Sequence, residues 1–187
     1  MMRRLISIVA LVGMPAVATA QSAAPAPADS TPTPVAKASD VGSMDAILTE
    51  LYAVISGPAG PRDWDRFYSL FAPGARLIPT RRDSTGATHI VPLTPREYAQ
   101  HAGQVFAKQS FYEHEIGREV NTFGAVTQVF SAYASRHEAS DPKPFARGIN
   151  SIQLFNDGTR WYVVTIYWDS ERPGTTIPEQ YLHPAAR

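Results

Sequence analysis

The side chains of this sequence best suited to chemistry are a histidine and several hydroxyl and amide groups in its second half. A histidine can carry a proton near neutral pH, and tyrosine hydroxyls can donate hydrogen bonds to a bound molecule. If the protein is an enzyme, we expect His114 to act as its acid or base. The predicted ligand-binding residues are Tyr112, His114, Ser131, Tyr133, Asn150, Thr165 and Tyr167.

Other kinds of chemistry have no support in the sequence. The chain has no cysteine, which excludes a thiolate nucleophile, a disulfide and a cysteine-ligated zinc. Its five histidines lack the paired spacing of metal ligands, and no glycine-rich loop is present to hold phosphate. We therefore expect no metal and no cofactor. Lysine plus arginine balances aspartate plus glutamate, 17 against 17, without a basic block, so we expect no nucleic-acid partner.

The candidate residues are predicted to share one face of an antiparallel sheet. The segment 156–159 separates two β-branched and aromatic runs with an Asp-Gly pair, which is typical of a hairpin. Counting outward from this turn and two earlier ones places alternate residues of four strands on one face. The candidate residues form its polar end, and a bulge in any strand would shift later assignments by one residue. The apolar end consists of Ile116, Val129, Ile152, Leu154, Trp161 and Val163.

The helices that would cover this face lie earlier in the chain. Apolar residues at helical spacing predict helices at 44–55 and 64–71, and a capping-box pattern at 94–97 starts a third. Tyr52 and Tyr98 lie on the apolar faces of the first and third helices. Short strands are predicted at 75–79 and 89–92, and a meander at 111–120, 125–138, 145–155 and 160–169. The fold class is therefore α+β, with three helices packed on a curved antiparallel sheet.

The order of these elements resembles the NTF2-like fold, also called SnoaL-like. The segments that carry the resemblance are DWDRFYSLFAPGARLI near the start and NDGTRWYVVTIYWDSE near the end, and RGINSIQL and IPEQYL resemble exported members of unknown activity. The resemblance implies a cone-shaped domain over residues 43–170. The superfamily includes ketosteroid isomerase, scytalone dehydratase and limonene epoxide hydrolase. No set of catalytic residues in this chain matches any of these enzymes position by position.

The other face of the predicted sheet has glutamates at its edge and apolar residues at its centre. Glu113, Glu115 and Glu119 are expected in solvent, since a run of charge is usually solvated. The apolar residues form a patch too large to remain exposed, so we expect a homodimer through this face. The patch consists of Phe130, Ile149, Tyr162, Ile166 and Trp168.

Three functions remain open from the sequence, and we favour the first. It is the binding of a small, partly apolar ligand in the concave cavity without covalent chemistry, because no carboxylate is placed to orient His114. The second is a cofactor-free isomerase, dehydratase or hydrolase that uses His114 as acid or base. The third is a self-associating scaffold without a ligand, in which the polar residues hydrogen-bond to one another.

Residues 1–20 have the three parts of a secretory signal peptide. Arg3 and Arg4 precede an apolar run, and Ala18 and Ala20 are the small residues of a cleavage site. The run is too short to span a bilayer comfortably, so no stable membrane span is expected after cleavage. Residues 21–42 are rich in alanine, proline, serine and threonine, which predicts a flexible linker. The domain at 43–170 and a C-terminal tail at 171–187 complete the chain.

We predict that the protein is secreted or periplasmic and that it is cleaved after Ala20. Intact-mass measurement of the exported protein should therefore give a chain that begins at Gln21. A mature chain that still begins at Met1, or protein confined to the cytosol, would contradict export.

Overall fold

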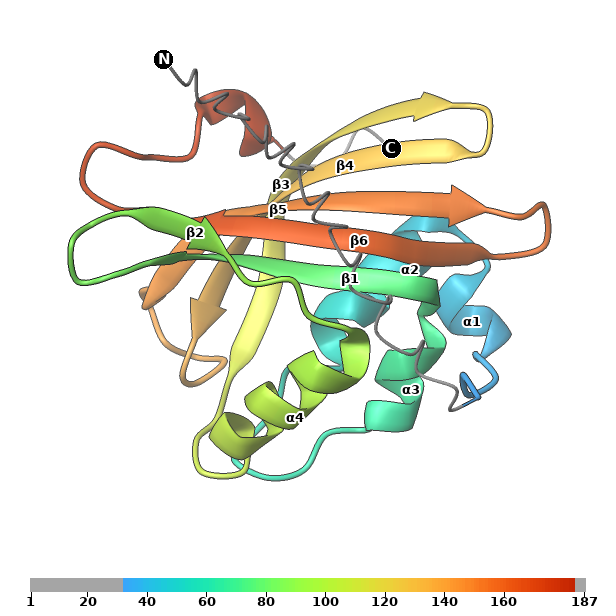
Figure 1. Cartoon of the computed structure of the whole chain (residues 1–187), viewed down its shortest axis with the longest axis horizontal. Coiled ribbons are helices and arrows are strands. Elements are labelled where there is room, and N and C mark those ends of the chain that lie inside the picture. Colours follow the sequence, from blue (N-terminus) through green and yellow to red (C-terminus); the bar gives the residue numbers. More distant parts are fainter. Residues whose placement is uncertain (1–31, 184–187) are drawn as a thin grey trace, which may run out of the picture. The chain divides into compact units, whose positions relative to one another are not determined.

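The computed structural model describes residues 32–183 (Figure 1). The predicted signal peptide lies outside the described residues, so export stays a prediction. The helices are α1 (Ala38–Val41), α2 (Met44–Ala53), α3 (Trp64–Ser69), α4 (Pro95–Phe106) and the 3₁₀ helix η1 (Glu179–Tyr181). The strands are β1 (Phe71–Arg82), β2 (Thr88–Ile90), β3 (Tyr112–Phe123), β4 (Val126–Arg136), β5 (Ala146–Asn156) and β6 (Trp161–Ser170). None of the described helices is long and apolar enough to cross a membrane.

The six strands form one sheet in the order β2-β1-β6-β5-β4-β3. The strands from β3 to β6 pair antiparallel, which confirms the predicted meander. β1 runs parallel to β6, so the sheet is mixed and the prediction of a wholly antiparallel sheet was wrong. β1 also begins earlier than predicted, because Phe71 already pairs with Val163 and the Val163 amide donates to the Leu70 carbonyl at 2.9 Å.

Side chains cap the starts of three helices. Ser43 accepts a hydrogen bond from the amide of Ala46 at 3.0 Å before α2. Asp63 caps α3 in the same way. Thr94 and Glu97 form the predicted capping box, and proline at the first position of α4 has no amide hydrogen to leave unpaired. These caps satisfy amides that no helix can satisfy internally, which fixes where each helix starts.

The short helix α1 lies within the predicted linker. Asp40 and Val41 are buried, and Asp40 accepts hydrogen bonds from the Arg66 guanidinium at 2.8 and 3.0 Å. Order therefore begins before residue 43, and the prediction of a flexible linker up to residue 42 was wrong at its end. The described residues contain four α-helices rather than the three predicted.

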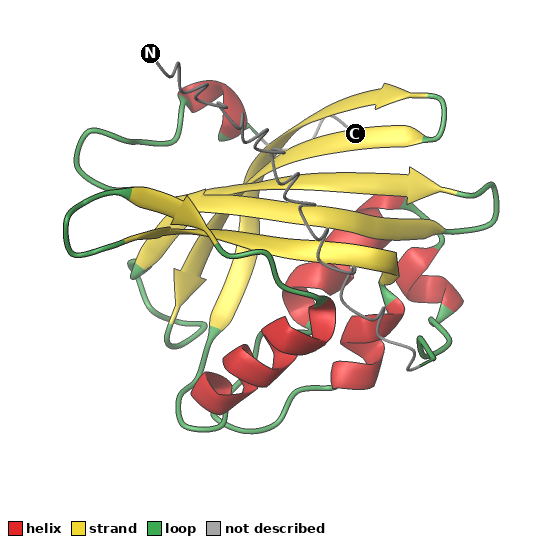
Figure 2. Cartoon of the chain, in the orientation of Figure 1, coloured by secondary structure: helices red, strands yellow, loops and turns green. Residues whose placement is uncertain are grey.

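The hydrophobic core lies between the helices and the concave face of the sheet. Figure 2 shows α2, α3 and α4 on the same side of the sheet. Phe67 of α3 and Leu48 of α2 are almost completely buried there. Most of the apolar end that the sequence predicted belongs to this core, namely Val129, Ile152, Leu154 and Val163.

Two β-bulges interrupt the sheet. One lies in β3, where Ile116 is the extra residue between Glu115 and Gly117, and the other lies in β6, where Val164 is the extra residue opposite Gln153 and Leu154. An extra residue reverses the alternation of side chains between the two faces and bends the strand. Residues in β3 before Ile116 and residues in β6 after Val164 therefore lie on the face opposite to the one predicted by counting from the turns.

The C-terminal tail packs on the convex face. The rings of Tyr181 and Phe130 lie 5.2 Å apart, and the His183 carbonyl accepts a hydrogen bond from the Arg118 amide at 3.2 Å. A Cβ atom on Gly117 would overlap the backbone of Tyr181 and Leu182, so glycine permits this close approach. The tail therefore covers part of the patch that the sequence assigned to a dimer.

The rest of that patch differs in composition from the prediction. The bulge in β6 turns Ile166 and Trp168 toward the concave side, so their assignment to the convex face was wrong. Val164 and Tyr167 are 37% and 45% exposed instead, and with them the convex face still presents apolar surface to solvent. Dimerisation stays a prediction.

We predict that Tyr167→Glu weakens self-association, because it places a charge in this exposed apolar surface. Sedimentation velocity at micromolar concentration should give a dimer for the parent and a monomer for the variant. Val105→Glu is the matched control, since Val105 is 47% exposed on α4 and its variant should remain dimeric. A monomeric parent would rule out the dimer and leave the tail as the cover of this face within residues 32–183.

Candidate functional site

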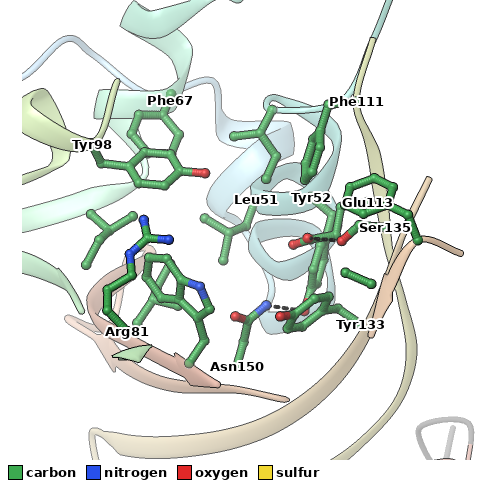
Figure 3. A pocket seen from close by; sticks show the side chains of 16 residues that line it. Leu51, Tyr52, Phe67, Arg81, Tyr98, Phe111, Glu113, Tyr133, Ser135 and Asn150 are labelled. Atoms are coloured by element: carbon green, nitrogen blue, oxygen red, sulfur yellow. Dashed lines mark hydrogen bonds between the residues drawn. The ribbon is translucent and has the colours of Figure 1, made fainter. Parts of the chain in front are cut away.

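A cavity of about 340 Å³ lies between the helices and the concave face of the sheet (Figure 3). This volume is at the lower end of the range for small-molecule sites. Most of the lining is aromatic or aliphatic, and it includes Leu51, Ile55, Phe67, Leu77, Phe111 and Trp168. Glu113, Ser135, Tyr52 and Asn150 gather at one side and make that side polar.

Glu113 is the titratable group at the polar side. Its Oε2 accepts a hydrogen bond from Ser135 Oγ at 2.7 Å. Burial raises the pKa of Glu113 from its ordinary value of 4.5 to about 7, and hydrogen bonds from Ser135 and Asn150 offset only part of this rise. Glu113 forms no ion pair with any described residue. Its carboxyl group can therefore be protonated or ionised near neutral pH.

A chain of hydrogen bonds extends from Asn150 across the concave face. Asn150 Nδ2 donates to the Tyr52 hydroxyl at 3.1 Å, and that hydroxyl lies 2.6 Å from Ser131 Oγ. Ser131 donates in turn to Glu115 Oε1 at 2.5 Å, so its oxygen accepts the proton of Tyr52. Burial raises the pKa values of Tyr52 and Glu115. Each donor in the chain has one acceptor, and the polar side is fixed without a ligand.

Tyr98 presents a hydroxyl from the opposite wall. Its ring stacks on Phe67 at 5.5 Å and meets Trp168 edge to face at 6.2 Å, which holds the side chain in place. Burial raises the pKa of Tyr98, and the charge of Glu113 raises it further. The Tyr98 hydroxyl has no hydrogen-bond partner among residues 32–183. It is therefore available to a bound molecule.

Three of the predicted ligand-binding residues lie on the concave face, namely Ser131, Tyr133 and Asn150. Tyr133 and Asn150 line the cavity, and Ser131 belongs to the hydrogen-bond chain beside it. Tyr133 lies against Gly148, where a Cβ atom would overlap its ring, and its hydroxyl lies 2.9 Å from Ser170 Oγ. Burial raises the pKa of Tyr133 to about 12. Ligand contact by these residues stays a prediction.

Two predicted residues of β3 lie on the convex side, so their assignment to the cavity was wrong. Tyr112 and His114 precede the bulge at Ile116, which reverses their direction. His114 is exposed, and its Nε2 lies 3.2 Å from Arg136 Nη1. Burial and the charge of Arg136 both lower the pKa of His114. The same bulge turns Glu113 and Glu115, expected in solvent, toward the helices.

Two predicted residues of β6 are also on the convex side, and their assignment to the cavity was wrong for the same reason. Thr165 and Tyr167 follow the bulge at Val164, and their strand partners are Gln153 and Ser151. Tyr167 is largely exposed. Their places on the concave face are taken by Ile166 and Trp168, which makes this wall more apolar than predicted.

Sequence reasoning missed Tyr52, Tyr98 and Glu113 as site residues. Both tyrosines lie on apolar helix faces, and a buried hydroxyl that requires a partner was the available signal. The signal for Glu113 was Gly117, because an isolated glycine in a strand is a known sign of a bulge, and the bulge in β3 directs Glu113 inward.

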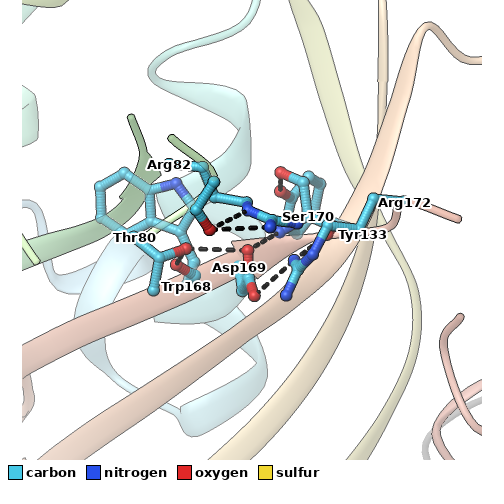
Figure 4. Close-up of polar contacts among 8 residues, drawn as sticks. Thr80, Arg82, Tyr133, Trp168, Asp169, Ser170 and Arg172 are labelled. Carbon is cyan, nitrogen blue, oxygen red and sulfur yellow. Dashed lines mark hydrogen bonds and ion pairs between the residues drawn. The ribbon is translucent and has the colours of Figure 1, made fainter. Parts of the chain in front are cut away.

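Asp169 lies at the end of β6 and has a structural role (Figure 4). Its carboxylate accepts hydrogen bonds from Thr80 Oγ1 at 2.8 Å and from Arg172 Nη1 at 2.7 Å. Burial would raise the pKa of Asp169, but the hydrogen bonds from Arg172 and Thr80 hold it below its ordinary value. These bonds tie β1, β6 and the start of the tail together and leave the carboxylate outside the cavity.

The described part of the chain contains no group of three or more histidine, cysteine, aspartate or glutamate residues that could hold a metal ion. The polar side of the cavity has one carboxyl group, an amide and hydroxyls. Such a set can bind an uncharged donor or move a proton.

Comparison with known proteins identifies the fold. No family model and no curated protein matches the chain. A solved structure from Streptomyces avermitilis, described as a proposed dehydratase of the NTF2-like family, shares 10% identity over 71% of this chain and 96% of its own, with a TM-score of 0.51. A protein of unknown function with a cystatin-like fold from Nostoc punctiforme shares 13% identity over 69% of this chain and 93% of its own, with a TM-score of 0.50.

The described domain is thus an α+β domain with the NTF2-like fold, which confirms the resemblance seen in the sequence. Identity at this level shows the fold alone, and one fold carries many functions. The function must therefore be argued from the cavity.

We predict that the free energy of unfolding falls as the pH rises from 4.5 to about 7, and that Glu113→Gln removes part of this fall. In that window the carboxyl group has lost its proton in the unfolded chain but keeps it in the folded one, so raising the pH favours unfolding. Glu113 contributes at most about 3 kcal/mol to this fall, because each unit of pKa difference between the folded and unfolded chain corresponds to 1.36 kcal/mol. Urea denaturation at a series of pH values measures it.

Glu119→Gln is the control, because Glu119 lies on the same strand and is exposed. It should leave the pH dependence unchanged. If the curves of the parent and Glu113→Gln remain parallel between pH 4.5 and 7, the pKa of Glu113 is not raised.

Proposed function

We propose that the concave cavity binds a small, partly apolar molecule whose hydrogen-bond donor meets Glu113. The observation that supports this is an aromatic cavity of about 340 Å³ with one carboxyl group that has no ion-pair partner among the described residues. Burial of such a group without a partner costs free energy. A bound donor satisfies the carboxyl group, and an apolar body fills the remaining space.

The position of Glu113 is fixed before any ligand arrives. Ser56 Oγ donates to the Glu113 carbonyl at 3.1 Å and accepts from its amide at 2.9 Å, which joins β3 to the end of α2. Ser135 holds the carboxyl group itself. A preformed site loses little conformational entropy on binding, so even a small ligand can bind measurably.

2-Naphthol is a suitable probe, because it has an apolar bicyclic body and a single hydroxyl donor. We expect it to bind the parent protein in isothermal titration calorimetry at pH 8, and Glu113→Gln to weaken binding about tenfold, the typical value of one hydrogen bond to a charged group. His114→Gln is the matched control on the same strand and should bind like the parent. Absence of binding, or equal binding by Glu113→Gln, would overturn the proposal.

A second function, cofactor-free acid–base catalysis, is favoured by one observation. The carboxyl group of Glu113 and the hydroxyl of Tyr98 face the same cavity. An ionised Glu113 could take a proton from a bound carbon acid, while Tyr98 donates a hydrogen bond to the oxygen that gains charge. This keeps the isomerase, dehydratase or hydrolase class considered from the sequence but moves the acid–base role from His114 to Glu113.

The same variants separate binding from catalysis. 2-Tetralone has the size of 2-naphthol and hydrogens next to a carbonyl that exchange with D₂O when a base removes one of them. An acid–base site speeds this exchange, which NMR measures, and Glu113→Gln abolishes it while His114→Gln does not. If 2-tetralone binds without faster exchange, the cavity binds ligands only.

A further inference from the structure

A second charged group without an ion-pair partner lines the cavity at its exposed end. The guanidinium of Arg81 has no hydrogen bond, ion pair or ring contact within the described residues. Every other arginine in the described part of the chain has at least one such contact, as Arg66 and Arg172 illustrate. Figure 3 shows the guanidinium of Arg81 on the side of Tyr98, with Glu113 and Ser135 across the cavity.

The alternation of β1 explains why Arg81 points inward. Leu77 lies four residues before Arg81, on the same face of the strand, and is buried in the core. Arg82 lies on the other face and donates to the Gly86 carbonyl at 2.8 and 3.1 Å. Of these two neighbouring arginines, one stabilises the β1–β2 turn, and the other lines the cavity without a partner of its own.

Arg81 and Glu113 do not neutralise each other. An arginine close to a carboxyl group lowers its pKa, but the pKa of Glu113 is raised, and no arginine contributes to it. Other acids near arginines are paired directly, such as Asp40 with Arg66. The cavity therefore holds a cation at one end and a titratable acid at the other, separated by apolar side chains.

We propose that the natural ligand is an amphipathic carboxylate: an apolar body of ring size with a carboxylate at the end near Arg81 and a hydroxyl or amine donor at the end near Glu113. This rests on the proposed function and specifies its ligand class. A guanidinium binds a carboxylate through two parallel hydrogen bonds. Tyr98 and Trp168 line the cavity beside Arg81 and offer apolar surface to the body of such a ligand.

The test compares two molecules that differ only at the charged end, 6-hydroxy-2-naphthoate and 6-hydroxy-2-naphthamide. In calorimetry at pH 8 and low salt, the parent should bind the carboxylate about tenfold more tightly than the amide, as expected for a charge-assisted hydrogen bond at a partly exposed site. Arg81→Gln should remove this preference and leave the affinity for the amide unchanged. Arg82→Gln is the matched control and should keep the preference, because Arg82 faces away from the cavity.

The outcomes distinguish this inference from the proposed function. If 2-naphthol binds but the parent binds carboxylate and amide equally, or Arg81→Gln keeps the preference, the assignment of the carboxylate end is wrong and the cavity still binds ligands. If none of the three molecules binds the parent, both proposals fail. A preference that shrinks in 0.5 M salt and disappears in Arg81→Gln supports a direct ion pair at the exposed end.

Discussion

The curvature of the sheet is the constraint on which the rest of the structure depends. The sheet must bend around α2, α3 and α4 while its strands stay paired, and the bulges at Ile116 and Val164 supply this bend. Each bulge also reverses which side chains face inward. In β3 it directs Glu113 into the cavity, and in β6 it directs Ile166 and Trp168 there. The bulges that shape the concave face therefore also decide its chemistry.

The inward glutamates of β3 differ in how well they are satisfied. Glu115 accepts a hydrogen bond from Ser131 and lies 3.3 Å from Arg118 Nε. Glu113 has hydrogen bonds but no cation among the described residues. Burial raises the pKa of both glutamates, and that of Glu113 reaches about 7. A buried polar network stabilises a fold only where its members find partners. The hydrogen bonds through Asn150 and Tyr52 thus connect Glu115, whose carboxylate is satisfied, to Glu113, whose carboxyl group a ligand can satisfy.

The sequence predicted the parts of the site in which strand alternation is undisturbed. Tyr133 and Asn150 were placed on the correct face because the pairing of β4 with β5 contains no bulge, and its register differs from the count by an even number of residues, which keeps the face. His114 was misplaced, although an isolated glycine in a strand is a known sign of a bulge and Gly117 follows Ile116 directly. Val164 carries no such sign, so the reversal in β6 could not be predicted. The parallel pairing of β1 with β6 depends on contacts distant in sequence, which the local pattern does not encode.

The protonation state of Glu113 depends on which end of a ligand lies against it. A hydroxyl or amine donor that binds Glu113 stabilises its ionised form and therefore lowers its pKa. Because the pKa of Glu113 is about 7, binding of a donor near neutral pH shifts the carboxyl group from partly protonated to ionised and releases a fraction of a proton. A ligand without a donor has the opposite effect, since it removes water from the carboxyl group and favours the protonated form. Calorimetry measures this proton release, because the heat of binding then depends on the ionisation enthalpy of the buffer. The measurement therefore reports which end of a ligand lies against Glu113.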